Sequence, residues 1–334
     1  MQIPPRLKPG DEIRVLALSR SLAGAMNLYG FTESDVQFAT SRLESLGLTV
    51  SFGRRVMECN EHLTASPQHR LEDLHEAIAD PSVKAILAVV GGIGATQILD
   101  GIDYRQIKAH PKIICGYSDI GHLCNAIFAR TGVVTYYGPH FTTFMMRLGA
   151  DYTVYNFRQC LFTDSPLEVQ PTDVWSDDAW NSDQQNRNFH KNDGFWAIQD
   201  GQAEGAIIGG NYFGLNMLQG SSYFPPLREG ILFLEQPANG KATLMELDAG
   251  LRALSFQPEF PGVRAIVIGR YAQSGLVTQE NLAELIRDIP ALNHLPVIGN
   301  CDFGHVNPIL TLPIGGRCQL QVSNGQASIT LTEH

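Results

Sequence analysis

The sequence predicts an α/β protein of two domains, the first built on a parallel sheet and the second mixed and β-rich. Three observations support this fold class. The chain has 334 residues, more than one ordinary hydrophobic core accommodates. Roughly the first 150 residues alternate short apolar runs with longer helical patterns, as βαβ units do. From Gly201 onward strand-like runs outnumber helical stretches, which predicts a second, mixed α/β domain.

The N-terminal elements follow one another as in an open parallel sheet of the flavodoxin-like kind. Predicted strands cover residues 13–19, 48–52, 83–90, 112–115 and 133–137, and predicted helices cover 32–46, 68–79 and 122–130, with another helix before the fourth strand. Thr32 is a suitable N-cap, and Gly47 comes just past the end of the same helix. Open α/β sheets bind ligands beyond the carboxyl ends of their strands, so we expect a site at the turns that follow these strands.

The predicted division places an N-terminal α/β domain at residues 1–155, a linker and substrate loop at 156–200, and a C-terminal domain at 201–334. Between residues 151 and 195 the chain is polar, and all three tryptophans lie in or beside this stretch, at positions 175, 180 and 196. In the C-terminal part, strand-like runs cover 203–208, 230–234, 265–268, 296–298, 318–322 and 327–331, and helical patterns cover 244–255 and 279–288.

Composition and charge favour a small substrate. The formal net charge is −10, and the 24 Lys and Arg residues are scattered, which argues against a nucleic-acid partner. No stretch approaches the ~18 consecutive apolar residues of a membrane span, so we expect no membrane partner either. The first residues lack the apolar core and cleavage site of a signal peptide, so we expect a cytoplasmic protein.

The six cysteines are expected to be reduced, buried thiols. They lie at positions 59, 115, 124, 160, 301 and 318 without a C-x-x-C pair, and four of them sit in or beside apolar runs. A zinc site built from Cys59, His62, Cys301 and His305 is conceivable from ligand type alone. Its spacing matches none of the common zinc patterns, so we predict no metal.

Ser118 is the candidate nucleophile. It lies in the segment 116–121 (GYSDIG), directly after the apolar strand 112–115 and before a helical pattern. A serine on a strand-to-helix turn is well placed for attack once a base removes its proton, and the amides of the next helix face developing negative charge. The spacing differs by one residue from the strict G-x-S-x-G pattern, so a simple helix N-cap is the other interpretation of Ser118.

A pair of glycines supplies candidate oxyanion donors. Gly91 and Gly92 end the apolar strand 83–90, and glycine amides can approach a ligand closely because no side chain intervenes. An ordinary glycine turn has the same sequence, so this feature points to a site only in combination with others.

A candidate base and a candidate carboxylate lie in the C-terminal half. His305 follows strand 296–298 in a loop rich in Gly, Asn and Pro, where an imidazole can titrate, and His140 is its main rival. Glu235 ends the apolar strand 230–234, where it can orient a histidine. A solvated acid in a turn is the other interpretation of Glu235.

Taken in order along the chain, these features resemble the serine peptidases of the LD-carboxypeptidase family. The resemblance rests on five segments in register, at 90–92, 116–119, 208–211, 232–235 and 303–305, and on the opening run 7–13. It implies a triad of Ser118, His305 and Glu235, with the amides of Gly92 and Asp119 as oxyanion hole. It also implies a homodimer with no metal and no organic cofactor.

Within that family, the tryptophan-bearing stretch is similar to the microcin C immunity, or MccF-like, branch, in which an aromatic-bearing loop helps to hold a nucleotide-like part of the substrate. The resemblance implies a carboxypeptidase or amidase that cleaves an amide bond near a free carboxylate in a peptide or peptidyl-nucleotide substrate. It implies substrate contacts from Gly91, Asn211, Trp175 and Trp180. Ile93 departs from the resemblance, which leads us to expect an aromatic residue after the glycine pair.

Three other functions stay open on the sequence. A murein tetrapeptide LD-carboxypeptidase, which cleaves between an L- and a D-residue, would use the same triad. A substrate-binding homologue without turnover would keep the same fold. A hydrolase with Cys115 as nucleophile is disfavoured because this residue lies inside the predicted strand and not at its turn.

Overall fold

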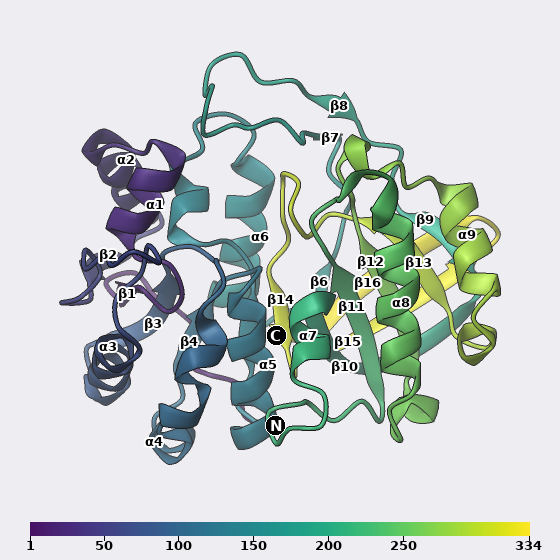
Figure 1. The fold of residues 1–334 in the computed structure, drawn as a ribbon, viewed down its shortest axis with the longest axis horizontal. Helices are drawn as coiled ribbons and strands as arrows, with labels where there is room; N and C mark the ends of the chain where they lie inside the picture. The colour runs from purple at the N-terminus through teal and green to yellow at the C-terminus, as the bar shows by residue number, and fades with distance from the viewer.

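The structure, a computed structural model, describes residues 1–334 as two main sheets with helices packed around them (Figure 1). The N-terminal half lies on the left of Figure 1 and the green and yellow C-terminal half on the right. A long teal segment crosses above both halves after the short strand at residues 167–168. Both termini lie near the boundary between the halves.

Six strands form the N-terminal sheet in the spatial order β14-β5-β4-β3-β1-β2, and only β14 runs antiparallel to its neighbour. The strands are β1 (Glu12–Leu16), β2 (Thr49–Phe52), β3 (Val83–Ala88), β4 (Ile113–Cys115), β5 (Thr135–Tyr137) and β14 (Leu312–Ile314). The helices are α1 (Leu22–Tyr29), α2 (Glu33–Glu44), α3 (Pro67–Ala79), α4 (Tyr104–Ala109), α5 (Ile120–Thr131) and α6 (Asp151–Phe162). The order of the five parallel strands, 2-1-3-4-5, is that of flavodoxin-like sheets, so the predicted fold class is confirmed for this half.

Eight strands form the second sheet in the order β6-β16-β15-β10-β11-β12-β13-β9, parallel from β10 to β13 and antiparallel at its edges. They are β6 (Leu167–Glu168), β9 (Trp196–Gln199), β10 (Gly201–Asn211), β11 (Gly230–Glu235), β12 (Ala265–Gly269), β13 (Val297–Cys301), β15 (Arg317–Ser323) and β16 (Gln326–Glu333). The helices are α7 (Tyr212–Met217), α8 (Thr243–Ser255) and α9 (Gln279–Arg287). This mixed, β-rich sheet confirms the second predicted fold class. None of the helices combines the length and the apolar character that crossing a lipid bilayer requires.

Several elements gave no clear sequence signal. β14 is a three-residue strand with Pro313 at its centre, so it has no alternating pattern that would reveal it. α1 and α7 span only eight and six residues. α6 continues past residue 155, the predicted domain boundary, and buries Phe157 and Leu161 in the core around the N-terminal sheet.

The two sheets share one apolar core. Its largest buried cluster contains side chains from both, among them Ile114 of β4 and Val267 of β12. The halves pack closely at Tyr137: a Cβ added at Gly210 of β10 would lie 2.6 Å from its ring, and one added at Gly121 of α5 would lie 2.8 Å from the same ring. β14 strengthens this connection, because it comes late in the sequence but pairs with β5 of the first sheet. The carboxyl ends of strands from the two sheets are therefore held at a fixed distance from each other.

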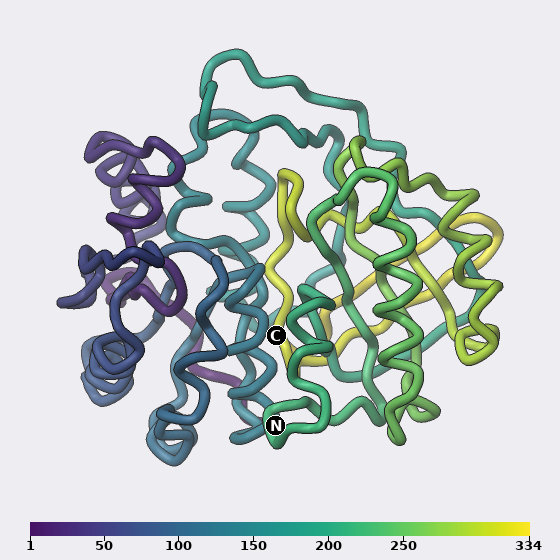
Figure 2. Tube along the Cα trace, in the orientation of Figure 1, coloured from purple at the N-terminus to yellow at the C-terminus, as the bar shows by residue number.

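Residues 163–195, here called the crossing segment, connect α6 to β9. After β6 this segment passes over the top of the molecule, as the tube in Figure 2 shows. A small hairpin of β7 (Val174–Trp175) and β8 (His190–Lys191) stabilises it. On the N-terminal side Gln184 accepts a hydrogen bond from the amide of Arg147 at 2.9 Å. On the C-terminal side Ser176 and Asn307 exchange two backbone hydrogen bonds, of 2.7 and 2.9 Å. The segment is thus attached to both halves.

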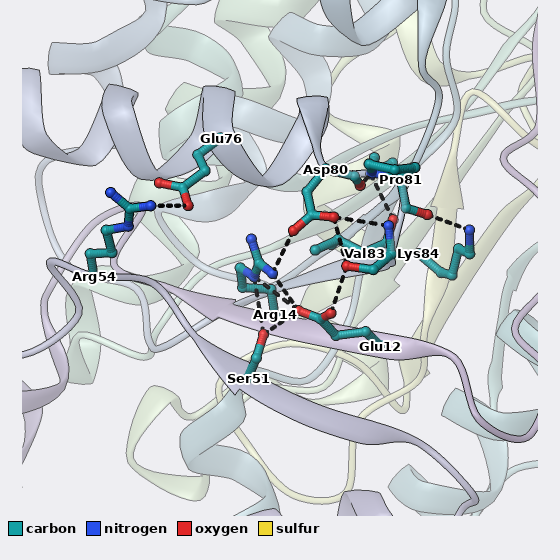
Figure 3. A network of polar contacts seen from close by, with 11 residues as sticks. Glu12, Arg14, Ser51, Arg54, Glu76, Asp80, Pro81, Val83 and Lys84 are labelled. Atoms are coloured by element: carbon teal, nitrogen blue, oxygen red, sulfur yellow. Dashed lines mark hydrogen bonds and ion pairs between the residues drawn. The ribbon is translucent and has the colours of Figure 1, made fainter.

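A network of ion pairs and hydrogen bonds closes the amino ends of the N-terminal strands (Figure 3). Arg14 donates to Glu12 at 2.6 Å, to Asp80 at 2.9 Å and to Ser51 at 3.0 Å. Hydrogen bonds from Ser82 and from Arg14 lower the pKa of Asp80 to about 2. This end of the sheet is therefore occupied by structural charges, and the opposite end, where the strands finish, is free to hold a site.

Candidate active site

Ser118 lies on a sharp turn between the carboxyl end of β4 and the start of α5. Its φ is +59°, a left-handed conformation that is uncommon for a residue with a side chain. The N-cap residue of α5 is Asp119, so Ser118 does not serve as the helix cap. A strained strand-to-helix turn of this kind exposes a nucleophilic hydroxyl in other hydrolases.

The imidazole of His305 lies between Ser118 and Glu235. Its Nε2 is 2.9 Å from Ser118 Oγ, and its Nδ1 is 2.7 Å from Glu235 Oε2. With the proton on Nδ1, the ring donates to the carboxylate and accepts from the serine hydroxyl. The structure thus brings these three predicted residues together in one hydrogen-bonded path, with the hydroxyl supplied next to the first sheet and the other two groups next to the second.

Glu235 is buried at the end of β11, where its side chain is only 1% exposed. Its second oxygen accepts hydrogen bonds from the Tyr137 hydroxyl at 2.5 Å and from the Asn211 amide at 3.4 Å. Gly304 packs directly against the carboxylate, because a Cβ there would lie 2.7 Å from Glu235 Oε2. The structure therefore places Glu235 in the interior and not in a solvated turn.

Tyr137 is a site residue that the sequence analysis missed. Its hydroxyl accepts a hydrogen bond from the amide of Ser118 at 3.0 Å while it donates to Glu235, so it connects the turn to the carboxylate directly. Burial raises the pKa of the Tyr137 hydroxyl well above its usual value, and the neighbouring Glu235 raises it further. The hydroxyl therefore keeps its proton and remains a donor. The only signal in the sequence was a polar atom at the end of an apolar strand.

The glycine pair lies directly against Ser118. A Cβ on Gly91 would lie 2.9 Å from Ser118 Cβ and 3.4 Å from the amide nitrogen of Asp119, so only glycine leaves this space open. The amides of Gly92 and Asp119 donate to no group within the protein. Both predicted oxyanion donors are therefore available to a ligand.

The side chain of Asp119 holds the glycine loop in place. It accepts hydrogen bonds from Ser19 Oγ at 2.5 Å and from the amides of Gly94 and Ala95 at 2.7 and 2.8 Å. Burial alone would raise its pKa, but hydrogen bonds from His122, Ser19 and Gly94 outweigh this and hold the pKa well below the usual range. The carboxylate is therefore charged throughout the neutral range and fixes the loop that carries Gly92.

His140, the rival base, lies in the wall of the same cavity but makes no hydrogen bond to Ser118. Its Nε2 donates to the carbonyl of Tyr117 at 2.7 Å, and its ring stacks on Tyr117 with the centroids 4.0 Å apart. Burial lowers the pKa of His140 to about 3. The ring is therefore neutral at physiological pH, and its position suits a supporting role better than that of a base.

A cavity of about 230 Å³ opens in front of Ser118. It is lined by Arg20, Tyr29, Val90, Gly91, Gly92, Ile93, Tyr117, Ser118, His140 and His305. Of the predicted substrate contacts, Gly91 lies in this wall and Asn211 lies behind it, bonded to Glu235. Trp175 packs over Arg270, and Trp180 stacks on Phe31 with the centroids 5.5 Å apart, so neither tryptophan lines the cavity itself.

The cysteines and the conceivable zinc ligands do not form a site. All six cysteines are free, five of them buried and Cys59 exposed. No group of three or more His, Cys, Asp or Glu side chains has an arrangement that could hold a metal ion. Cys115 is buried inside β4, and burial raises the pKa of its thiol well above the usual value. A protonated, inaccessible thiol is a poor nucleophile, so the structure gives no support to Cys115 in that role.

Comparison with known proteins identifies the family. Residues 13–138 match the LD-carboxypeptidase N-terminal domain, and residues 204–320 match the LD-carboxypeptidase C-terminal domain. The chain belongs to the LD-carboxypeptidase family. The putative carboxypeptidase YocD of Bacillus subtilis is 43% identical over 329 residues, which cover 98% of this chain and 99% of the relative.

Solved structures of this family share the whole fold. The crystal structure of an MccF-like protein from Bacillus anthracis is 44% identical, covers all of both chains and has a TM-score of 0.96. The microcin C7 self-immunity protein MccF of Escherichia coli is 28% identical over 302 residues, or 86% of either chain. MccF in complex with glutamyl sulfamoyl guanosine is 26% identical to this chain, with 99% and 98% of the two chains covered and a TM-score of 0.86. MccF has also been solved in complex with aspartyl sulfamoyl adenosine.

Replacement of Tyr137 by Phe tests its connection between the turn and the carboxylate. The change leaves the Ser118 amide without a partner and leaves the buried oxygen of Glu235 with only the longer hydrogen bond from Asn211, so we expect the free energy of unfolding to fall by about 1–3 kcal/mol. We expect acylation of Ser118 by a fluorophosphonate to slow by roughly tenfold or more, because Glu235 then orients His305 less well. Chemical denaturation and labelling rates measure both. The Tyr136 hydroxyl is buried without a partner, so Tyr136→Phe is the matched control, and equal effects in the two variants would contradict the assignment.

The neutral state of His140 predicts a loss of stability in acid. Its pKa is about 3 in the native state against 6.5 for an ordinary histidine, so between these values the unfolded chain binds a proton that the native protein does not. Stability from this source is complete above pH 6.5 and falls as the pH drops, with a slope approaching about 1.4 kcal/mol per pH unit. Denaturation curves between pH 4 and 6.5 should therefore show a shallower pH dependence for His140→Gln than for wild type. Parallel pH profiles would show that His140 is not buried in its neutral form.

Proposed function

We propose that this LD-carboxypeptidase family member is a serine carboxypeptidase or amidase that hydrolyses an amide bond near a free carboxylate. The observation that carries the proposal is the 2.9 Å approach of His305 Nε2 to Ser118 Oγ, with Glu235 2.7 Å from the other ring nitrogen. A serine hydroxyl is inert at neutral pH unless a base removes its proton, and this geometry supplies the base and the group that orients it.

The proposed reaction proceeds through an acyl-enzyme. His305 Nε2 takes the proton of Ser118 as Oγ attacks the carbonyl carbon, and Glu235 keeps the remaining ring proton on Nδ1. The amides of Gly92 and Asp119 donate to the oxygen that becomes negative. The imidazolium then protonates the leaving nitrogen, and the C–N bond breaks. A water molecule, deprotonated by the same imidazole, hydrolyses the ester and restores Ser118.

In this proposal each of the two predicted domains supplies part of the catalytic groups. The N-terminal domain (1–155) supplies Ser118 and the oxyanion donors, and the C-terminal domain (201–334) supplies Glu235 and His305. The family resemblance supports a homodimer, and a location in the cytoplasm is part of the same proposal. The 26% identical MccF binds aminoacyl sulfamoyl nucleotides, which supports an aminoacyl-nucleotide or a related peptide as substrate.

A product-mass experiment tests the proposal. We expect the purified protein to split aspartyl sulfamoyl adenosine into aspartate and sulfamoyl adenosine, and expect the rate of Ser118→Ala to be at least about a thousandfold lower. Mass spectrometry of the products measures both. Release of terminal D-alanine from a muropeptide tetrapeptide, with the conjugate intact, would assign the protein to the murein alternative. No turnover of either compound would contradict the proposal and favour a binding homologue.

Trp180 offers a second test, directed at the nucleotide part of the substrate. Its ring stacks on Phe31, which lies 5.7 Å from Tyr29 in the cavity wall, so the crossing segment reaches the cavity through these aromatic rings. A base stacked on Trp180 would contribute about 1–3 kcal/mol. We expect Trp180→Ala to lower kcat/KM for aspartyl sulfamoyl adenosine roughly tenfold to a hundredfold, and for a plain tetrapeptide less than about threefold. Trp180→Phe keeps a stacking surface, so its kcat/KM for aspartyl sulfamoyl adenosine should lie between the values for wild type and for Trp180→Ala. Equal losses on both substrates would rule out base stacking.

A further inference from the structure

Arg20 is the one arginine in the wall of the cavity in front of Ser118, and this wall contains no carboxylate side chain. The residue follows β1 at the carboxyl end of the N-terminal sheet, on the same edge as the glycine pair. Its Cζ lies 3.7 Å from the position that a Cβ on Gly92 would occupy, so the guanidinium packs beside a proposed oxyanion donor. It is therefore close to the place where the scissile amide of a substrate would lie.

The guanidinium of Arg20 is poorly satisfied within the protein. An arginine has five N–H donors, but the only hydrogen bond from this side chain goes from Nη1 to the Tyr29 hydroxyl at 3.1 Å. Its Nε is buried without a partner, and no carboxylate lies within 4 Å of it. The contrast with other arginines is clear, since Arg14 pairs with Glu12 and Asp80 and Arg270 pairs with the buried Asp302. A partly buried guanidinium without a partner costs folding free energy, and a ligand that accepts its hydrogen bonds would offset this cost.

A second cavity continues from the first at Arg20. Its volume is about 320 Å³, and it is lined by Ser19, Arg20, His62, Thr64, Ile93, Gly94 and Gln97, again with no acidic side chain. The two cavities share Arg20 and Ile93. Arg20 thus stands where a substrate that occupies both cavities must pass, and it presents positive charge to each.

Aromatic residues hold Arg20 in this position. The Tyr29 ring lies 5.9 Å from Arg20 Cζ, Phe31 lies 5.7 Å from Tyr29, and Trp180 stacks on Phe31. The side chain is therefore supported on one side by packed rings, which lowers the entropy that it loses when it binds a ligand. A planar guanidinium held in this way matches the two oxygens of a carboxylate.

We infer that Arg20 binds the free carboxylate of the substrate next to the scissile amide and so selects acidic substrates over their amides. This inference rests on the proposed function and names the group that recognises its substrate. Two sources supply such a carboxylate, one in each part of the substrate that the reaction separates: the side chain of an aspartyl group on the acyl side, and the C-terminus of the leaving residue. Both have the same chemistry at Arg20, and the experiment below distinguishes them.

Two matched pairs of compounds test the inference. One pair is aspartyl and asparaginyl sulfamoyl adenosine, and the other is diacetyl-L-lysyl-D-alanine and its C-terminal amide. We expect wild type to prefer the acid in one pair by about a hundredfold in kcat/KM, and Arg20→Gln to lose that preference by slowing the acid alone. The pair that responds identifies the position of the carboxylate. Arg20→Lys keeps the charge but loses the paired N–H donors of the guanidinium, so it should retain part of the preference for the acid.

The control removes a guanidinium elsewhere. Arg54 is 77% exposed, pairs with Glu76 outside both cavities (Figure 3) and is expected to tolerate Arg54→Gln without a change in either preference. Labelling of Ser118 by a fluorophosphonate verifies that each variant is folded. An acid preference that survives Arg20→Gln, or an equal loss on acid and amide, would overturn the inference.

A readout without turnover separates this inference from the proposed function. If wild type hydrolyses none of the four compounds, the proposed function fails for them, but the same compounds can still protect Ser118 from the fluorophosphonate. We expect an acid to protect wild type at a concentration at least about tenfold lower than its amide does, and this difference to vanish in Arg20→Gln. Equal protection by acid and amide in wild type, or no protection by any compound, would overturn the assignment of Arg20.

Discussion

The candidate active site depends on one buried charge, the carboxylate of Glu235. No arginine or lysine pairs with it, although its side chain is almost fully removed from solvent. A buried carboxylate costs several kcal/mol unless hydrogen bonds and a neighbouring positive group compensate it. Here the Tyr137 hydroxyl, the Asn211 amide and the His305 imidazole surround its oxygens. Because these groups come from separate parts of the chain, the need to satisfy one carboxylate fixes β5, the end of β10 and the loop after β13 around a common point.

This convergence requires the two sheets to keep their relative position. Ser118 follows β4 of the first sheet, while Glu235 ends β11 and His305 follows β13 of the second sheet. The close packing of the Tyr137 ring against glycines of both halves leaves little room for sliding, since packed interiors resist small displacements. The late strand β14 has the same effect, because the chain returns from the second sheet to pair with β5. The shared core is thus part of the geometry that sets the distance between hydroxyl and imidazole.

The sequence was informative wherever local chemistry carries the signal. Apolar periodicity predicted the parallel strands, and the strand-to-helix turn pointed to Ser118, which the structure places within hydrogen-bonding distance of His305. Tyr137 was not predictable, because a tyrosine that ends an apolar strand looks like core until its hydroxyl partners are known. β14 was missed because it is stabilised by pairing with the distant strand β5 and not by a strand propensity of its own residues. The family resemblance named Trp180 as a substrate contact, but only coordinates could show that its nearest aromatic partner is Phe31.

The two-bond ladder between Ser176 and Asn307 has a consequence for how this fold can change. Ser176 follows Trp175 in the crossing segment, and Asn307 is two residues from His305, so one short ladder joins the connector to the imidazole loop. The hairpin tip at 177–189 lies beyond the ladder, so its replacement would remove the stack of Trp180 on Phe31 and the bond of Gln184 to Arg147 but would leave the ladder in place. An insertion or deletion before residue 176 would instead shift the ladder and so displace the imidazole of His305. Changes of sequence and length are therefore tolerated best in the tip, which can be replaced as a unit while the residues of the ladder stay constant.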